Sequence, residues 1–330
     1  IIIMVILVFI ILLIDHNKME KLLWPFINII DEGGRAVKII CLRGPLERDE
    51  DIIKFKNYKK KGYLLLGCSS YLSFPLRIQN PHAKEDLHLF NGKRYDTMVH
   101  GWLHCFKEEG KILTKNKLLL SESDFMDNIQ FLRDYDVKNK KIRYDFICFC
   151  PSDGEECNRG WNHYNKNWSL SKDTIEYLCN SLKLHGVLVG REHCTLNING
   201  GNLKRVRNLP YYDFLDYISA SRFMVIPNRE DASPRIIAEG LLLDTPLLMS
   251  EGILGGWKYI NKKTGVFYTI ENIEIRSKEL LYNIQEGNYS PREYYLKNYG
   301  RNNSGKLLRD FVCSINPSFS RYKYLYFPIS

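Results

Sequence analysis

The chain has 330 residues, of which 45% are hydrophobic and 26% are charged, and its formal net charge is +9. This composition is typical of a soluble globular protein with enough apolar residues for two domains, and it excludes a chain that is disordered throughout. The positive charge favours an anionic partner, such as a nucleotide, a phosphate, nucleic acid or a membrane surface, but it does not select among them.

The chain opens with an apolar run, Ile1–Ile14, that contains no polar side chain. Fourteen helical residues rise about 21 Å, short of the roughly 30 Å hydrocarbon core of a bilayer, and no basic residue precedes the run as in a signal peptide. We therefore expect a buried strand, followed by a helix over residues 16–32 that ends at Gly33 and Gly34, and by a strand at Ala36–Leu42. A membrane anchor at Ile1–Ile14, with membrane contact, is the alternative.

Short β-rich runs recur along the rest of the chain, separated by stretches with helical periodicity, notably Ser169–Leu184 and Tyr211–Ser219. The expected strands are Tyr63–Leu66, Met98–Trp102, Lys117–Leu120, Phe146–Phe149, Val187–Val189, Phe223–Ile226 and Pro246–Met249. Continuous apolar runs are typical of parallel strands that are buried on both faces. The alternation therefore predicts an α/β fold with parallel sheets.

The charge-rich connection Asp134–Asp145 predicts a boundary between two such domains, residues 1–140 and 141–330, with the last helix a candidate to pack back on the first domain. The basic clusters Lys59–Lys61 and Lys204–Arg207 are flanked by loop-like residues, and we interpret them as solvated surface, not as nucleic-acid sites. The nine cysteines form no repeated C-x-x-C spacing. They indicate reduced thiols in a cytosol-like, cytoplasmic compartment.

The segment REDASPRIIAEGLLLDTPLLM, which begins at Arg229, contains a short predicted helix. Ser233 is a suitable N-cap, Pro234 suits the first helical position, and Asp244 begins a turn that ends the helix after Leu243. The helix is apolar on nearly every face. It is therefore expected to be buried almost all round.

One polar stripe interrupts this apolar helix, because Arg235 and Glu239 share a face at i and i+4. A buried unpaired charge costs several kcal/mol, so the two side chains either pair with each other or face a cleft. In a cleft, the helix N-terminus and Arg235 would bind phosphate, and Glu239 would accept hydrogen bonds from sugar hydroxyls. Asp231 would reach the same space from the end of the preceding strand.

These residues resemble a known motif. Two acids with seven residues between them, followed by a turn, a proline and an aliphatic strand, are similar to the donor-binding E-x7-E segment of GT-B glycosyltransferases (family 4-like), with Asp231 in place of the first Glu and Glu239 as the second. Five further stretches agree in order with that family: YDFICFC, NKNWSLSKDTIEYLCNSL, HGVLVG, LPYYDFLDYISASRFMVIPN and LGGWKYINKKTGVFY. The resemblance spans Tyr144–Tyr268 and implies two Rossmann-like, doubly wound domains with a cleft between them.

The resemblance implies a metal-independent glycosyltransferase that moves a sugar from a nucleotide-sugar to a glycan or other hydroxyl acceptor, with no further cofactor. Glu239 would bind the donor ribose and Asp231 the donor sugar. The diphosphate would lie on Arg235 or on the helix N-terminus next to Ser233. Lys166 and Arg159 would take the place of the family's basic residues on the donor phosphates.

The segment between the two acids departs from the family. Ala232-Ser233-Pro234-Arg235 stands where Gly-Phe-Gly is usual and is closer to the S-x-R pattern of exostosin-like transferases. E-x7-E families mostly retain the anomeric configuration and exostosin-like ones invert it, so both outcomes stay open. In an inverting enzyme His100, His104 or Asp96 would be the general base, whereas a retaining enzyme requires none.

Several alternatives accompany this interpretation. Asp134-Tyr135-Asp136 is a D-x-D, as in metal-dependent GT-A enzymes, but it follows a helix-like pattern instead of a strand end. His100, His104 and Cys105 could together ligate zinc, but no fourth ligand stands at a spacing typical of a zinc site. We therefore expect no metal. A nucleotide-sugar epimerase of the same fold and a catalytically silent nucleotide-sugar-binding module are the alternative functions.

Overall fold

The computed structural model describes residues 22–69, 73–76, 87–114, 116–127, 135–137, 139–153, 157 and 159–328. The chain divides into two compact units: unit 1 comprises Ile1–His104, Glu108–Leu120 and Ser304–Ser330, and unit 2 comprises Cys105–Lys107 and Ser121–Asn303. The strand predicted at Ile1–Ile14 lies outside the described residues. Within the described ranges, no helix combines the length and the apolar character needed to cross a membrane.

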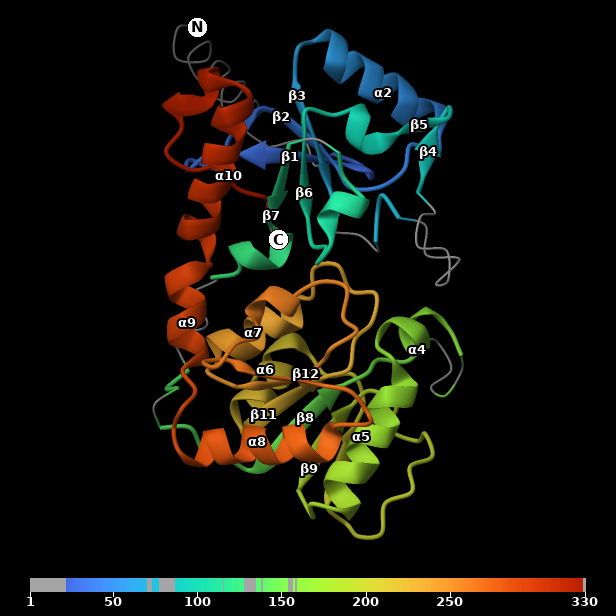
Figure 1. Cartoon of the computed structure of the whole chain (residues 1–330), viewed down its shortest axis with the longest axis vertical. Helices are drawn as coiled ribbons and strands as arrows, with labels where there is room; N and C mark the ends of the chain where they lie inside the picture. The colour runs from blue at the N-terminus through green and yellow to red at the C-terminus, as the bar shows by residue number, and fades with distance from the viewer. Residues whose placement is uncertain are drawn as a thin grey trace, which may run out of the picture. The chain divides into compact units, whose positions relative to one another are not determined.

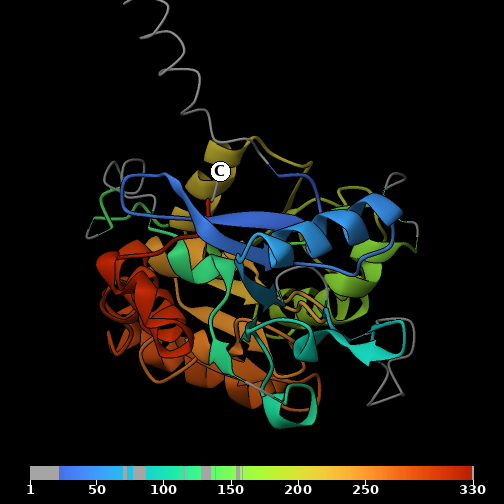
Figure 2. The ribbon, with the colours of Figure 1, turned by 90° about the horizontal axis from the view of Figure 1, so that it is seen from above.

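Unit 1 contains a five-stranded sheet in the order β1-β2-β3-β6-β7. Its strands are β1 (Phe26–Ile30), β2 (Ala36–Leu42), β3 (Leu64–Cys68), β6 (Gly101–His104) and β7 (Lys117–Leu119). β1 is antiparallel to β2, and the other neighbours are parallel. The helix α2 (Asp49–Lys60) connects β2 to β3 and lies beside β3 (Figures 1 and 2). The short elements β4 (Leu89–Phe90), β5 (Lys93–Arg94), η1 (Tyr95–Thr97) and η2 (Glu109–Lys111) complete this part.

The helix predicted over residues 16–32 is wrong where the structure describes it. Phe26–Ile30 forms the strand β1, because Pro25 has no amide hydrogen to continue a helix and the following residues are mostly β-formers. The carboxylate of Asp31 then accepts hydrogen bonds from the amides of Gly33 and Arg35, both at 2.9 Å. These bonds close the turn that returns the chain as β2.

The end of the chain returns to unit 1. The helix α10 (Arg301–Ile315) enters it at Ser304, and its side chains Phe311 and Ile315 lie against Gly101 of β6. After η5 (Pro317–Arg321), Tyr326 forms an antiparallel bridge with Ile30.

Unit 2 contains a six-stranded parallel sheet in the order β10-β9-β8-β11-β12-β13. Its strands are β8 (Tyr144–Phe149), β9 (Gly186–Val189), β10 (Leu203–Val206), β11 (Ser221–Ile226), β12 (Leu247–Ser250) and β13 (Gly265–Tyr268). The chain runs outward from β8 to β10 and then crosses to β11 on the other side of β8. The strand order therefore reverses between β8 and β11, as in a dinucleotide-binding domain.

Helices cover both faces of this sheet (Figure 1). One face packs on α5 (Trp168–Asn180) and α8 (Ile273–Gln285), and the other packs on α6 (Tyr211–Ser219), α7 (Arg235–Leu242) and α9 (Pro291–Asn298). The short elements η3 (Glu122–Phe125), α4 (Trp161–Asn165) and η4 (Trp257–Tyr259) lie in the connections. Along β8, Ile147 packs in the core under α6, α7 and α9, whereas Phe146 and Cys148 pack in the core under α5 and α8. Both faces are thus apolar, which explains the continuous apolar runs.

The α/β class with parallel sheets is confirmed, and α6 has its predicted bounds. The solvated surface expected at Lys204–Arg207 is confirmed for Lys204 and Arg207, which are exposed, and Leu203–Val206 forms the edge strand β10, where charged side chains are tolerated. The division between the units falls after Leu120 and not at residue 140. Ser123 of η3 explains the difference, because its hydroxyl lies 3.0 Å from that of Tyr259, deep in unit 2.

Candidate functional site

A cavity of about 470 Å³ opens in unit 2 at the carboxyl ends of β8 and β9 and beside the start of α7. Phe149 and Val189, the last residues of those two strands, form part of its wall. In open α/β sheets, ligands bind outside the carboxyl ends of the strands where the strand order reverses. The cavity lies at that position, and its volume is within the roughly 300–1,000 Å³ of small-molecule sites.

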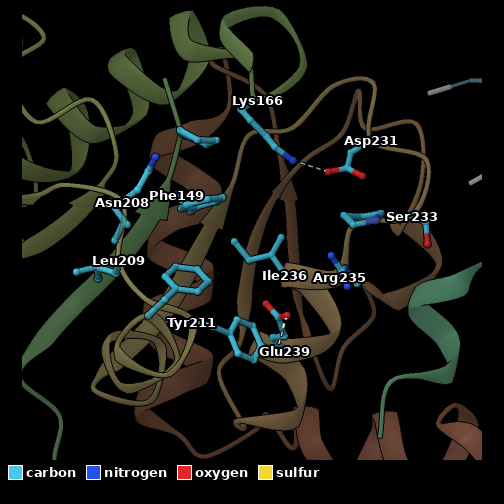
Figure 3. A pocket seen from close by; sticks show the side chains of 14 residues that line it. Phe149, Lys166, Asn208, Leu209, Tyr211, Asp231, Ser233, Arg235, Ile236 and Glu239 are labelled. Carbon is cyan, nitrogen blue, oxygen red and sulfur yellow. Dashed lines mark hydrogen bonds and ion pairs between the residues drawn. The ribbon is translucent and has the colours of Figure 1, made fainter. Parts of the chain in front are cut away.

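The two ends of the cavity differ in polarity (Figure 3). Lys166, Asp231, Ser233 and Arg235 gather at one end, whereas Phe149, Asn208 and Leu209 lie at the other, with Tyr211 and Glu239 along the edge between them. The remaining lining residues are Pro151, Val189, Phe214, Pro234 and Ile236. A ligand with one anionic end and one flat or apolar end would match this distribution.

The helix α7 presents its polar stripe to this cavity, since both Arg235 and Glu239 line it. The predicted cap is wrong, because Pro234 occupies the N-cap position. The hydroxyl of Ser233 instead accepts a hydrogen bond from the amide of Ser123, at 2.9 Å. This bond connects the loop before α7 to η3.

Glu239 is the most buried acid of the cavity, with 7% of the residue exposed. The hydroxyl of Tyr211 donates to its Oε1 at 2.9 Å. Burial raises the pKa of Glu239, and the Tyr211 hydrogen bond and the charge of Arg235 oppose that rise. Among the ion pairs of the described residues, none joins Arg235 to Glu239. The stripe therefore faces the cavity instead of pairing internally.

Lys166 and Asp231 reach toward each other across the other end of the cavity (Figure 3). Lys166 is the C-cap of α4, and Asn167, in the left-handed conformation that asparagine tolerates, turns the chain into α5. The Nζ of Lys166 lies 2.6 Å from Oδ2 of Asp231, which also accepts from the side-chain amide of Asn228 at 3.1 Å. The two charges thus compensate each other at this end of the cavity.

The loops behind Lys166 are held by a capping carboxylate and a disulfide. Asp153 accepts from the amides of Asn162 and His163, at 2.6 and 2.8 Å, and so satisfies the first turn of α4. Cys157 and Cys194 form a disulfide between the loops that follow β8 and β9, so the prediction that all thiols are reduced is wrong. The fold brings together two cysteines whose sequence separation of 37 follows no recognisable pattern.

Arg159, the other basic residue predicted to bind donor phosphates, is exposed and does not line the cavity. The three candidates for a general base belong to unit 1. Asp96 is buried and accepts from Arg94 and from the amide and hydroxyl of Thr114. Burial raises the pKa of Asp96, but these hydrogen bonds outweigh that effect and hold the pKa below its usual value.

The two histidines of unit 1 differ in exposure. His104 is buried at the end of β6. His100 is exposed, and its Nδ1 lies 3.0 Å from the amide nitrogen of Leu65. In the part of the chain that the structure describes, no group of three or more His, Cys, Asp or Glu side chains is placed to hold a metal ion, and Asp134 of the D-x-D lies outside that part.

Several lining residues were not predicted as site residues from the sequence, among them Phe149, Asn208, Leu209 and Tyr211. Their signal was positional, because each follows or ends a strand of the parallel sheet, where ligand-contacting residues gather. The acid motif Asp231–Glu239 by itself carried no information on them.

Neither protein-family models nor curated protein sequences match this chain. Solved structures do. TarM superimposes with a TM-score of 0.52 at 10% identity, covering 84% of this chain and 54% of TarM. A mutant TarM from S. aureus, solved in complex with fondaparinux, alpha-GlcNAc-glycerol and UDP, also gives 0.52 at 10% identity, covering 81% and 54%. A glycosyltransferase from Rickettsia africae ESF-5 gives 0.51 at 13% identity, covering 84% and 77%.

The chain has the GT-B fold. The two Rossmann-like domains of that fold correspond to units 1 and 2, and the cavity lies in the second of them. At these identities the similarity shows the fold alone. The chain spans about half the length of TarM.

Proposed function

We propose that this GT-B protein is a glycosyltransferase that binds a nucleotide-sugar in the cavity of unit 2 and transfers the sugar to a glycan or other hydroxyl acceptor. One observation carries the proposal: two acids and two bases, Asp231, Glu239, Lys166 and Arg235, line one cavity at the point where the strand order reverses. The presence of UDP in the complex of the similar TarM mutant supports a nucleotide ligand.

The polarity of the cavity supports one orientation of the donor. The nucleobase packs at the apolar end, where the rings of Phe149 and Phe214 lie with their centroids 5.0 Å apart. The ribose hydroxyls donate to Glu239, and the diphosphate lies near Arg235 and the N-terminus of α7. The transferred sugar then lies near Asp231, in agreement with the resemblance of this segment to the E-x7-E motif.

The reaction forms a bond between the acceptor oxygen and the anomeric carbon and breaks the bond between that carbon and the diphosphate. The departing nucleoside diphosphate gains negative charge, which Lys166, Arg235 and the first amides of α7 stabilise. These groups supply the positive charge at the diphosphate, so we propose that the reaction needs no divalent metal. If the configuration is retained, the acceptor proton passes to an oxygen of the departing diphosphate. If it inverts, the proton passes to a base, and His100 and His104 suit this role better than Asp96, whose carboxylate is already saturated.

Release of nucleoside diphosphate from UDP-, GDP- and dTDP-sugars tests this function, with and without EDTA. We expect turnover of at least one donor that persists in EDTA and is lost in Glu239→Ala. The matched control is Glu230→Ala, since Glu230 belongs to the loop before α7 but does not line the cavity. Absence of turnover with every donor, with nucleotide binding preserved, would favour a silent binding module. Loss of turnover in EDTA would contradict metal independence.

A further inference from the structure

A tyrosine outside the acid motif Asp231–Glu239 holds the buried acid of the cavity. Tyr211 is the first residue of α6, and its hydroxyl donates to Oε1 of Glu239 at 2.9 Å (Figure 3). Tyr211 itself is 42% exposed, whereas Glu239 is 7% exposed. The ring therefore extends from the surface of α6 to a carboxylate that solvent hardly reaches.

This contact has a chemical consequence for ligand binding. A carboxyl group accepts hydrogen bonds from two hydroxyls well only when it is ionised, and burial favours the neutral form. A hydrogen bond donated to the carboxylate favours the ionised form and so opposes burial. With Oε1 held by Tyr211, Oε2 and the second lone pair of Oε1 serve the ligand.

We propose that Tyr211 is a positioning residue that keeps Glu239 an ionised acceptor for the ribose hydroxyls of a nucleoside diphosphate, and thereby extends binding to mildly acidic pH. This inference rests on the proposed function. It assigns to Tyr211 a role that acts through Glu239, without contact between its hydroxyl and the ligand.

Few other charges act on this carboxyl group. Arg235, one turn before it on α7, also favours its ionised form. Across the cavity, Lys166 and Asp231 neutralise each other. The elements packed against α7 carry Asp213 and Asp216 on α6, Glu122 and Asp124 on η3, and Arg292, Glu293 and Lys297 on α9.

Several of these groups have partners of their own, since Asp216 accepts from Tyr135, Asp124 pairs with Lys258, and Arg292 donates to the carbonyl of Leu242. Tyr211 and Arg235 are the two groups that oppose the effect of burial on Glu239.

The test is isothermal titration of the intact protein with UDP, GDP and dTDP between pH 5.5 and 8.5, for the wild type and Tyr211→Phe. Removing the hydroxyl raises the pKa of Glu239, so protonation at acidic pH should weaken binding. We expect a loss of affinity below about 3-fold at pH 8 that grows to about 10-fold or more at pH 6, since one pKa unit corresponds to a factor of ten.

Two controls isolate the effect. Tyr212→Phe alters the neighbouring tyrosine, which is 62% exposed, and should leave the profile unchanged. Glu239→Gln cannot titrate, so its profile reports the ligand's own phosphate, whose second pKa is about 6. In the double variant, Tyr211→Phe should add no further pH dependence.

The outcomes distinguish a failure of the role proposed for Tyr211 from a failure of the proposed function. One outcome is that the wild type binds nucleotide while Tyr211→Phe either leaves the affinity unchanged or weakens it by the same factor at every pH. In that case Tyr211 is only a packing residue and the inference is overturned. If the wild type binds none of UDP, GDP and dTDP, the proposed function fails and the inference fails with it. Thermal unfolding of each variant verifies that it is folded.

Discussion

Replacing Asp231 by asparagine should tighten the binding of a nucleoside diphosphate, whereas replacing Lys166 by methionine should weaken it. Asp231 holds the ammonium group of Lys166 at 2.6 Å. A diphosphate must compete for this cation and must also approach the Asp231 carboxylate, with which it shares the sign of its charge. Asparagine removes both obstacles while keeping the shape of the side chain.

The burial of the pair sets the size of the effect. The side chains of Lys166 and Asp231 are 15% and 18% exposed. An exposed ion pair contributes about 0.2–1 kcal/mol, and two charges 4 Å apart near a protein surface interact by about 4 kcal/mol. A largely buried pair at the rim of a cavity lies between these limits, at about 1–2 kcal/mol, which corresponds to about 5–30-fold in Kd. Relative to the wild type, Asp231→Asn should therefore lower the Kd for a nucleoside diphosphate, and Lys166→Met should raise it.

Titration calorimetry with UDP and GDP at a single salt concentration measures these changes. Both variants should also lower the free energy of unfolding, because each leaves a partly buried partner without its counter-ion. Asp145→Asn is the matched control, since Asp145 pairs with Arg222 at 3.0 Å elsewhere in unit 2 and does not line the cavity. If Asp231→Asn weakened nucleotide binding as much as Lys166→Met, the pair would serve to shape the cavity and the competition argument would be refuted.

Two further predictions concern stability. Because hydrogen bonds hold the folded-state pKa of Asp96 below its unfolded value, its stabilising contribution is present above about pH 4 and disappears as the pH falls through the folded pKa. Asp96→Asn should thus lower the free energy of unfolding by about 1–3 kcal/mol at pH 7 in urea titrations, with a smaller difference near pH 3; an equal difference at both pH values would contradict this. Reduction of Cys157–Cys194 by dithiothreitol should destabilise unit 2 by about 2–4 kcal/mol in thermal unfolding, and Cys313→Ser should not change that loss. No change on reduction would contradict it.

The central parallel strands of unit 2 were predictable, because a strand that is buried on both faces needs consecutive apolar residues. Val187–Val189 and Phe223–Ile226 show this pattern, and both lie in central strands. The edge strand β10 was not predictable in this way, since Lys204 and Arg205 extend from a strand with one solvent side. Likewise, β1 follows a stretch with helical spacing, and only Pro25 distinguishes its beginning.

The part of the site that depends on spacing within one segment of the chain was predictable. Glu239 and Arg235 lie on one helical face, and Asp231 follows a strand, so the sequence places all three at one edge of a sheet. Tyr211 was not accessible to this reasoning, because its partner is 28 residues away and the contact depends on how α6 packs beside α7. The same holds for the disulfide between two loops that only the sheet brings together.

The central claim is that the cavity beside α7 binds a nucleoside diphosphate through Glu239. Titration of the intact protein with UDP, GDP and dTDP at pH 7.5, repeated with Glu239→Gln, tests it most directly. We predict that at least one nucleotide binds with one-to-one stoichiometry. Glu239→Gln should weaken its affinity about 10-fold or more, because a charge-assisted hydrogen bond is lost, and should not lower the melting temperature. Failure of all three nucleotides to bind, or equal binding by Glu239→Gln, would contradict the claim.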